Sequence, residues 1–479
     1  MTPELTPEKT ESMATISRFR KPSVRHTYAV LAILEIGAMF FSLFLTFGYF
    51  HSLSDSFIRH LTSFEPIIFV LTLSLSIAAM GLYHSRQRSD AKELLARIII
   101  SFGLTSVLLA VCFYFIPYLE TSPKELVAAL GLSFLMVCMS RYSFSKLSNS
   151  TLIRRRILVL GAGEKARIIA DRLRRDNDQR GFRLLGYVPL SDTEDSITPR
   201  RRKKVDLNQL LSYAKRHRID EFVIAADDRR GTIPMDELYR CRVAGIYITD
   251  ITTFIEKECG KIPLNLLSPS WIIYSGGYKT NDLLVRALKR IFDIGICIFM
   301  LIATAPIMLI TALLIMLEGG PKAPLFYNQE RVGLHNRPFK IFKFRSMRVD
   351  AEANGAVWAK KNDDRVTVVG AFIRKYRIDE LPQLLNILKG DMSFVGPRPE
   401  RTVFVNGLTQ RIPYYGDRHL VKPGLTGWAQ ICYDYGGTED GAMEKLQYDL
   451  YYIKNYSLML DIMILIGTME VVLLGQGSR

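Results

Sequence analysis

Two adjacent acids, Asp379 and Glu380, stand near the start of the segment IDELPQLLNILKGDMSFVGPRPE in the last third of the chain. The acids precede Leu-Pro-Gln, an apolar run and then Gly390, a pattern that predicts a short helix with both acids in its first turn. Acids at such a position are favoured by the helix dipole alone. By itself, the pair therefore says little about chemistry.

Basic residues near the pair in sequence change what it could do. They are Lys343 and Arg345 in KFRSM, Arg374 and Arg377 just upstream, and Arg398 between Pro397 and Pro399. The two prolines restrict the backbone and hold a guanidinium with little entropy to lose on binding, and rigid arginines suit bidentate recognition of a diphosphate. A carboxylate among such cations can bind a metal or attack phosphorus, so one acid could be the nucleophile and the other could hold Mg²⁺. The helix start would also lower the pKa of the attacking carboxylate.

Composition indicates where this chemistry takes place. The chain has 479 residues, is 48% hydrophobic and carries a net charge of +16, with 63 Lys+Arg against 47 Asp+Glu. That combination is typical of a membrane protein with basic cytoplasmic parts and anionic partners. The sequence has no zinc-finger spacing and no RNA-binding aromatic signature, so nucleic acid is not expected as a partner. Its cysteines form no CxxC pair and its histidines no HxxxH, so neither disulfides nor a transition metal are expected.

Apolar runs predict membrane helices in the first third. A polar, basic tail (residues 1–26) precedes four runs within residues 27–145, at about 28–50, 67–83, 98–118 and 126–140. Each is near the ~20 residues that a spanning helix needs. The second connecting loop is rich in Arg and Lys, whereas the first and third have one basic residue each. The positive-inside rule therefore places the N-terminus, and everything after the fourth run, on the cytoplasmic side.

Residues 152–270 read as a Rossmann-like α/β domain, with a buried strand, a glycine turn and an amphipathic helix at its start. The turn carries a GxGxxA phosphate-binding fingerprint made of Gly161, Gly163 and Ala166. The acid that would hold a ribose is not clear, with Asp192 or Glu194 the nearest candidate. Either the loop binds a nucleotide, or its glycines only let the helix pack on the strand.

A second apolar segment, residues 294–317, is long enough to cross a bilayer. Basic residues flank it on both sides, which suits no single orientation, and Pro306 lies at its middle. Both features favour a helix that enters one leaflet and returns, spanning about 291–317. A proline-kinked spanning helix is the alternative. A last apolar segment, interrupted by Asp461 and Glu470, predicts a packed or interfacial helix.

Residues 281–479 resemble the catalytic domain of the bacterial sugar transferases, the monotopic phosphoglycosyl transferases that initiate exopolysaccharide, O-antigen and capsule synthesis. The motifs, in order, are RAxKRxFD, FYxQERVG, FKxFKFRSM, RIDELPQLLNILKGDMSFVGPRPE, KPGLTGWAQ and YDLYYIKNYSLMLD. The membrane helices and the Rossmann-like, CoA-binding-type domain resemble the long-form members, which suggest a homodimer. The expected fold is thus a membrane protein with four N-terminal transmembrane helices, an α/β domain and a C-terminal α+β domain with a re-entrant helix.

The resemblance implies a reaction at the cytoplasmic face of the bacterial inner membrane. A phospho-sugar would move from a UDP-sugar to polyprenyl (undecaprenyl) phosphate, and UMP would be released. The family's nucleophile maps to Asp379, which would form a covalent phosphosugar intermediate. The partner acid maps to Glu380, and the two acids together would be the protein's Mg²⁺ ligands.

The resemblance also assigns the basic positions and the helix break. The phosphate-binding positions correspond to Lys343, Arg345, Arg374 and the Pro397-Arg398-Pro399 turn. The family usually breaks the re-entrant helix at Ser-Pro. Here the residues are Ala305-Pro306, and Thr304 could supply the missing hydroxyl.

Two other function classes would each need features that this sequence does not provide. An NAD-dependent sugar-nucleotide dehydratase or epimerase would use the Rossmann-like domain, but the one YxxxK found, Tyr142–Lys146, precedes the glycine loop. A membrane scaffold or lipid-linked-sugar flippase would need a polar path through the spans, which carry few charges. Neither function would explain a carboxylate pair among arginines outside those spans.

Overall fold

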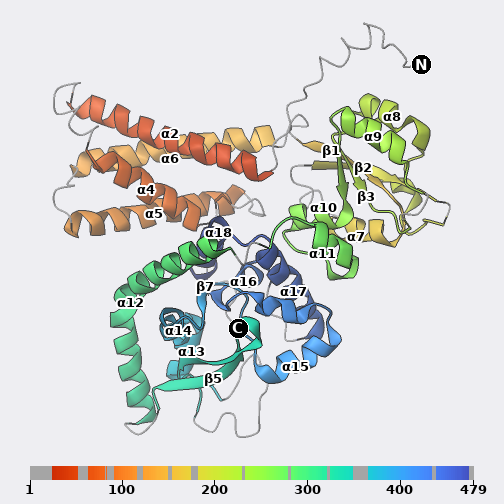
Figure 1. Ribbon diagram of the computed structural model, residues 1–479. Helices are drawn as coiled ribbons and strands as arrows, with labels where there is room; N and C mark the ends of the chain where they lie inside the picture. Colours follow the sequence, from red (N-terminus) through yellow and green to blue (C-terminus); the bar gives the residue numbers. More distant parts are fainter. Residues whose placement is uncertain are drawn as a thin grey trace. The chain divides into compact units, whose positions relative to one another are not determined.

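The computed structural model divides the chain into two compact units, Met1–Ile255 and Glu256–Arg479 (Figure 1). The predicted N-terminal tail, up to residue 23, and Asp192 lie outside the described residues. The predicted domain bounds stay predictions. The structure describes residues 24–51, 63–80, 82–83, 91–115, 122–148, 154–173, 182–191, 193–228, 232–278, 282–320, 324–348, 365–433 and 438–473.

Apolar helices begin the first unit: α2 (Val24–His51), α4 (Glu65–Ala79), α5 (Ala91–Phe115) and α6 (Pro123–Ser148). Helix α2 packs along α6, and α4 packs along α5 (Figure 1). Long apolar stretches of α2, α5 and α6 could each cross a bilayer, whereas the 15 residues of α4 fall short of the usual ~20. The predicted four-helix membrane region is therefore present, with its second helix shorter than expected.

A buried ionic cluster joins these helices. The Glu35 carboxylate on α2 accepts hydrogen bonds from Arg141 Nη2 on α6 at 2.9 Å and from the Tyr83 hydroxyl at 2.7 Å. Arg141 also donates to the carbonyl of Leu82 at 2.7 Å. Charges buried in apolar surroundings need such partners. The cluster fixes the end of α4 against α2 and α6.

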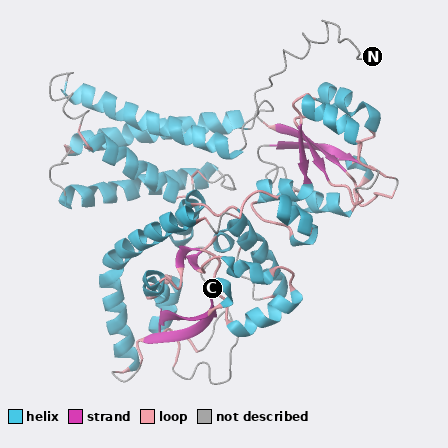
Figure 2. Ribbon diagram, in the orientation of Figure 1, coloured by secondary structure: helices cyan, strands magenta, loops and turns pink. Residues whose placement is uncertain are grey.

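A parallel sheet follows, formed by β1 (Arg155–Leu160), β2 (Phe182–Val188), β3 (Glu221–Ile224) and β4 (Tyr247–Asp250) in the order β2-β1-β3-β4 (Figure 2). Strand β1 is an apolar run buried on both faces, as parallel strands require. The helices are α7 (Glu164–Arg172), α8 (Leu210–His217), α9 (Met235–Val243) and α10 (Ile251–Cys259). Side chains of α8 and α9 share a core with β1, β2 and β3. The predicted Rossmann-like fold is confirmed.

Helix α12 (Leu283–Gly319) is the long apolar helix of the second unit. Its 37 residues include Pro306, and Figure 1 shows the helix bent between two arms. Proline removes the hydrogen bond to the carbonyl four residues earlier, here Ile302. The Thr304 hydroxyl bonds instead to the Met300 carbonyl at 2.7 Å, so the substitute role predicted for Thr304 is wrong. The bend suits re-entry, which stays a prediction.

The rest of the second unit is α+β, as predicted. Strands β5 (Phe326–Val332) and β6 (Pro338–Phe344) form an antiparallel hairpin, and β7 (Ser393–Val395) pairs in parallel with β8 (Gly424–Thr426). The helices are α11 (Pro269–Tyr274), α13 (Val368–Lys375), α14 (Gln383–Lys389), α15 (Thr402–Arg411), α16 (Trp428–Cys432), α17 (Glu439–Lys454) and α18 (Leu458–Leu473), with 3₁₀ turns η8 (Ile378–Glu380) and η9 (Tyr415–Leu420).

Two contacts hold α12 and α18 in this unit. Apolar side chains of α12, β6, α14 and β7 form one core around Cys297, Ile341 and Leu384. Lys289 on α12 pairs with the fully buried Asp461 of α18 at 2.7 Å. Helix α18 therefore packs in the unit, as the charges within its apolar sequence predicted.

Candidate active site

The acid pair lies in the 3₁₀ turn η8, just before α14 rather than in its first turn. Pro382 stands at the start of α14 and Gly390 ends it, as predicted. Arg377 precedes η8 with a φ of 55°, in the left-handed region that non-glycine residues rarely adopt. Both Asp379 and Glu380 are 8% exposed. The turn therefore presents two nearly buried carboxylates.

Strand β6 brings Lys343 to this turn. Asn386 of α14 fixes the strand, because its Oδ1 accepts from the Phe342 N–H at 3.0 Å and its Nδ2 donates to the Lys340 carbonyl at 2.8 Å. Lys343 Nζ then lies 3.0 Å from Glu380 Oε1. Sequence reasoning missed Asn386, although a single amide within the apolar run LLNIL was a signal for a buried hydrogen-bonding role.

The Pro-Arg-Pro turn follows β7, and each of its carbonyls has a donor. Those of Pro397, Arg398 and Pro399 accept from Gly424 N, Arg418 Nη2 and Arg331 Nη1 at 2.9, 3.0 and 3.2 Å. A Cβ at Gly396 would lie 2.4 Å from the Lys422 carbonyl oxygen, so glycine is needed where β7 and the β8 segment meet. The turn is thus held by hydrogen bonds as well as by its prolines. Sequence reasoning missed Arg418, for which no local pattern gave a signal.

Glu380 is held by the cations around it. Its Oε1 accepts from Arg398 Nη2 at 2.6 Å and from Lys343 Nζ at 3.0 Å, and its Oε2 lies 3.9 Å from Arg377 Nη1. Burial favours the neutral acid, but the charges of Arg398, Lys343 and Arg377 outweigh it and hold the pKa of Glu380 well below its usual value. Glu380 is therefore an anion near neutral pH.

Asp379 is in a different state. Among the described residues its carboxylate has no hydrogen bond and no ion pair. Burial raises the pKa of Asp379 to about 6, and the adjacent Glu380 adds to this effect against the charges of Lys343, Arg374 and Arg398. The helix dipole predicted a lowered pKa for Asp379. That prediction is wrong, because the effect of burial dominates. Within the described part of the chain, Asp379 is therefore a buried carboxylate that no cation binds.

Two further arginines offer unused donors. Arg374, at the end of α13, is close enough for its charge to act on Asp379. Arg345 follows Lys343 by two residues, beyond the end of β6. The Nη1 atoms of both arginines are buried without a hydrogen-bond partner in the described part of the chain. Buried, unpaired guanidinium nitrogens favour an anionic ligand.

The oxygens of the acid pair are the kind of ligand that a hard divalent cation prefers, but two side chains are too few to complete its coordination shell. Mg²⁺ in proteins is often held by one or two carboxylates, with water and substrate phosphates completing the shell. Asp379 and Glu380 could provide such oxygens, and Asp379 is unpaired within the described residues. No cluster of three or more His, Cys, Asp or Glu side chains that could hold a metal occurs in those residues. Any Mg²⁺ bound by these two acids would therefore take its remaining ligand oxygens from water or a substrate.

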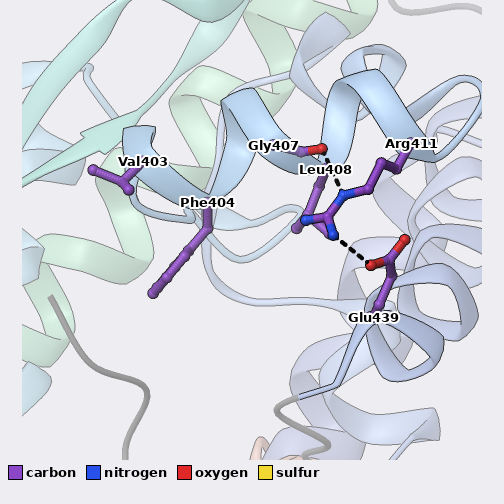
Figure 3. Close-up of a pocket in the computed structure, with 6 residues that line it drawn as sticks. All are labelled: Val403, Phe404, Gly407, Leu408, Arg411 and Glu439. Atoms are coloured by element: carbon purple, nitrogen blue, oxygen red, sulfur yellow. Dashed lines mark hydrogen bonds and ion pairs between the residues drawn. The ribbon is translucent and has the colours of Figure 1, made fainter.

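A separate hollow of about 220 Å³ lies beside α15 (Figure 3). Arg411 crosses it, pairing with Glu439 at 2.9 Å and donating to the Gly407 carbonyl at 3.1 Å. Val403, Phe404 and Leu408 supply an apolar lining. None of the acids or cations of the candidate site lines this hollow, so the two are separate places in the unit.

The glycine loop of the first unit is filled by the protein itself. Gly161 and Gly163 lie in the turn between β1 and α7, as predicted. The carboxylate of Asp227, from the segment after β3, accepts from the N–H groups of Glu164 and Lys165 at 2.8 and 2.9 Å. A Cβ at Gly163 would lie 1.9 Å from Asp227 Oδ2. Gly163 thus makes room for a carboxylate where a nucleotide phosphate would approach.

Glu194, one of the two acids considered for a ribose, also binds this loop. Its Oε2 accepts from the N–H groups of Ala162 and Leu190, both at 2.9 Å. The other candidate, Asp192, lies outside the described residues. The N–H groups that a phosphate would use are therefore occupied by the chain's own acids, which favours the packing interpretation of the glycines.

Fold and site together define a class: a membrane protein with a parallel α/β domain and a C-terminal α+β unit that holds two carboxylates among cations. Comparison with protein families agrees with this architecture. The model of the bacterial sugar transferase family matches residues 284–475, and a CoA-binding domain model matches residues 78–229.

Relatives of known name match different shares of the chain. A UDP-N-acetylgalactosamine-undecaprenyl-phosphate N-acetylgalactosaminephosphotransferase of Aeromonas hydrophila is 42% identical over 50% of this chain and 56% of its own length. An undecaprenyl-phosphate glucose phosphotransferase of Komagataeibacter xylinus is 32% identical over 72% of this chain and 64% of its own. A UDP-glucose:undecaprenyl-phosphate glucose-1-phosphate transferase of Xanthomonas campestris pv. campestris is 33% identical over 67% of each. The chain thus spans only 56% and 64% of the first two relatives, but it belongs to the bacterial sugar transferase family.

Proposed function

We propose that this protein transfers a phospho-sugar from a UDP-sugar to undecaprenyl phosphate and releases UMP, as the first step of a surface polysaccharide. The observation that carries the proposal is the nearly buried Asp379, which is unpaired within the described residues, beside a Glu380 that is bound by Arg398 and Lys343. The names of the relatives support both substrates.

In the proposed first step, an Asp379 oxygen attacks the phosphorus that carries the sugar. A bond forms between that oxygen and phosphorus, the bond from phosphorus to the bridging oxygen breaks, and UMP leaves with the electron pair. Lys343, Arg374 and Arg398 stabilise the charge on the diphosphate, and Arg345 lies close to Lys343 in sequence. In the second step an oxygen of undecaprenyl phosphate attacks the same phosphorus and releases the Asp379 carboxylate.

Mg²⁺ is the proposed cofactor, held by Asp379 and Glu380 together with substrate oxygens. When bound, it would neutralise negative charge on the diphosphate. The protein's own residues provide the charges around the proposed ion. Glu380 stays ionised among its cations, and the Pro-Arg-Pro turn holds Arg398 in place.

The proposed setting is the cytoplasmic face of the bacterial inner membrane, as a homodimer. One substrate is a soluble nucleotide and the other a lipid, so the site must lie at a membrane surface. The bent α12 would place its two ends, and hence the acid pair, on the side where UDP-sugars are made. An NAD-dependent reaction in the α/β domain is not favoured, because Asp227 fills the glycine loop.

The decisive experiment offers the full-length protein undecaprenyl phosphate and a panel of UDP-sugars and measures UMP release. We expect release with a UDP-hexose or a UDP-N-acetylhexosamine, together with a lipid-linked diphosphate sugar. Absence of UMP with every donor, from protein that melts cooperatively, would contradict the proposal. The panel also identifies the sugar, which the relatives leave open because they differ in it.

A further inference from the structure

Glu380 binds the cations that a diphosphate would need. Its Oε1 binds both Arg398 Nη2 and Lys343 Nζ, at 2.6 and 3.0 Å. Arg377 Nη1 lies 3.9 Å from its Oε2. The carboxylate is 8% exposed, so it competes for these donors with little interference from water. In the ligand-free protein, this pair of cations already has an anion.

The four cations that the sequence predicted to bind phosphate therefore fall into two sets. Lys343 and Arg398 form the closed set, because both bind Glu380. Arg345 and Arg374 form the open set, because each has a buried Nη1 without a partner among the described residues. Among the described residues no carboxylate holds the open set, so a phosphate that reaches it would displace no acid. It can reach the closed set only by taking the place of a carboxylate.

We propose, on the basis of the function proposed above, that Glu380 is an internal competitor of the substrate diphosphate. Its carboxylate takes the place of a phosphate in the free protein, and a nucleotide diphosphate gains Lys343 and Arg398 only when that carboxylate is drawn away. This arrangement gives two partly buried cations an anionic partner in the free protein. It also selects ligands with two charged groups, one for the open set and one to displace Glu380.

The competition predicts a coupling with divalent cations. A cation that binds Glu380 withdraws it from Lys343 and Arg398, which become available to phosphate oxygens. By thermodynamic linkage, the cation and the diphosphate must each tighten the binding of the other. Without Glu380, the diphosphate should bind well even when no metal is present.

The experiment measures the affinity of the full-length protein for UDP by calorimetry, in EDTA and in Mg²⁺, and compares wild type with Glu380→Gln. In EDTA we expect UDP to bind Glu380→Gln about tenfold more tightly than wild type, the effect of one charge-assisted hydrogen bond released to the ligand. We also expect Mg²⁺ to tighten UDP binding strongly in wild type and weakly in the variant. Glu400→Gln is the matched control, because it removes the same charge from a residue paired with Arg331 at 3.7 Å.

A double variant tests the assigned contact. In Lys343→Met the gain from Glu380→Gln should shrink, because one of the released donors is missing. Glu380→Ala is a second variant that removes the same carboxylate and should also bind UDP more tightly in EDTA. Thermal melting of each variant shows whether it is still folded. Equal or weaker UDP binding by folded Glu380→Gln in EDTA would overturn the competition, while Mg²⁺-dependent UDP binding by wild type would leave the proposed function intact. Failure of wild type to bind UDP under any condition would overturn both.

Discussion

Asp379 and Glu380 are neighbours in the chain, yet their surroundings push their pKa values in opposite directions. Burial raises the pKa of Asp379 to about 6, whereas Arg398 and Lys343 overcome the effect of burial at Glu380 and lower its pKa. Environments that separate two carboxylates in this way mark different roles. The acid with its cations in place is suited to charge balance, and the acid without a partner is suited to attack.

Replacing the unpaired acid should stop the proposed chemistry. Asp379→Asn keeps the shape of the side chain but removes the nucleophile, so we expect UMP release to fall by about 10³-fold or more. Covalent labelling of the protein by a UDP-sugar carrying the label in its sugar should disappear as well. Asp391→Asn, which changes an acid paired with Lys389 at 3.4 Å, is the control and should label normally. A labelled Asp379→Asn protein would rule out this residue as the nucleophile.

His419 should make the stability of the C-terminal unit depend on pH. Burial and the neighbouring Arg418 charge lower the pKa of His419 from 6.5 to about 4. The unfolded chain therefore takes up a proton at higher pH than the folded one. The contribution to stability is complete above about pH 6.5 and is lost as the pH falls toward 4, by up to about 3 kcal/mol.

The measurement compares the melting temperatures of wild type and His419→Gln at pH 7.5 and pH 5.0. Wild type should lose more on acidification, because the variant has no imidazole to protonate. Buried acids with raised pKa values, such as Asp449, act in the opposite sense but are present in both proteins. Parallel pH profiles for the two proteins would show that His419 does not titrate as described.

At the scale of elements, local pattern predicted much of the fold. The β1-turn-α7 unit, the end of α14 at Gly390 and the packed character of α18 follow from periodicity and turn residues, which act over a few positions. The partners of the site could not be predicted in this way. Arg418 reaches the Arg398 carbonyl across 20 residues, and Asp227 reaches the Lys165 N–H across 62. Such contacts depend on tertiary packing, which a local pattern does not encode.

The filled glycine loop gives a prediction for the α/β domain. Because the Asp227 carboxylate occupies the N-terminus of α7, wild type should not bind NAD, ADP or coenzyme A at the loop. Asp227→Ala should lower the free energy of unfolding by about 1–2 kcal/mol, since two backbone donors lose their acceptor. Calorimetry with each nucleotide tests binding by wild type, and thermal melting measures the stability of Asp227→Ala. Asp195→Ala, which removes an exposed acid of the same unit, is the control and should melt as wild type does. Tight binding of any of these nucleotides by wild type would contradict the assignment.

At the scale of the whole molecule, the path of α12 decides on which side of the membrane the proposed chemistry would lie. Leu283 and Leu317, near its two ends, are 76% and 82% exposed, so the fold itself does not cover cysteines at these positions. A re-entrant path predicts that a membrane-impermeant maleimide labels both from the cytoplasmic side. A cysteine at Phe64, before α4 and 70% exposed, should be labelled from the opposite side. Labelling of the two α12 positions from opposite sides would establish a spanning helix.

Activity of the C-terminal unit alone depends on where the chain is cut. Residues before α12 pack within this unit: Glu256 pairs with Lys454 at 2.7 Å, and the Gly260 carbonyl accepts from Trp428 Nε1 at 2.7 Å. A fragment of residues 256–479 should therefore fold in detergent and release UMP, whereas one of residues 281–479 leaves Lys454 and Trp428 without these partners. We expect the shorter fragment to be destabilised by about 3 kcal/mol or more and to lose activity in parallel. UMP release and thermal melting of the two fragments test this. If the longer fragment folds but is inactive, the membrane helices or the α/β domain take part in catalysis.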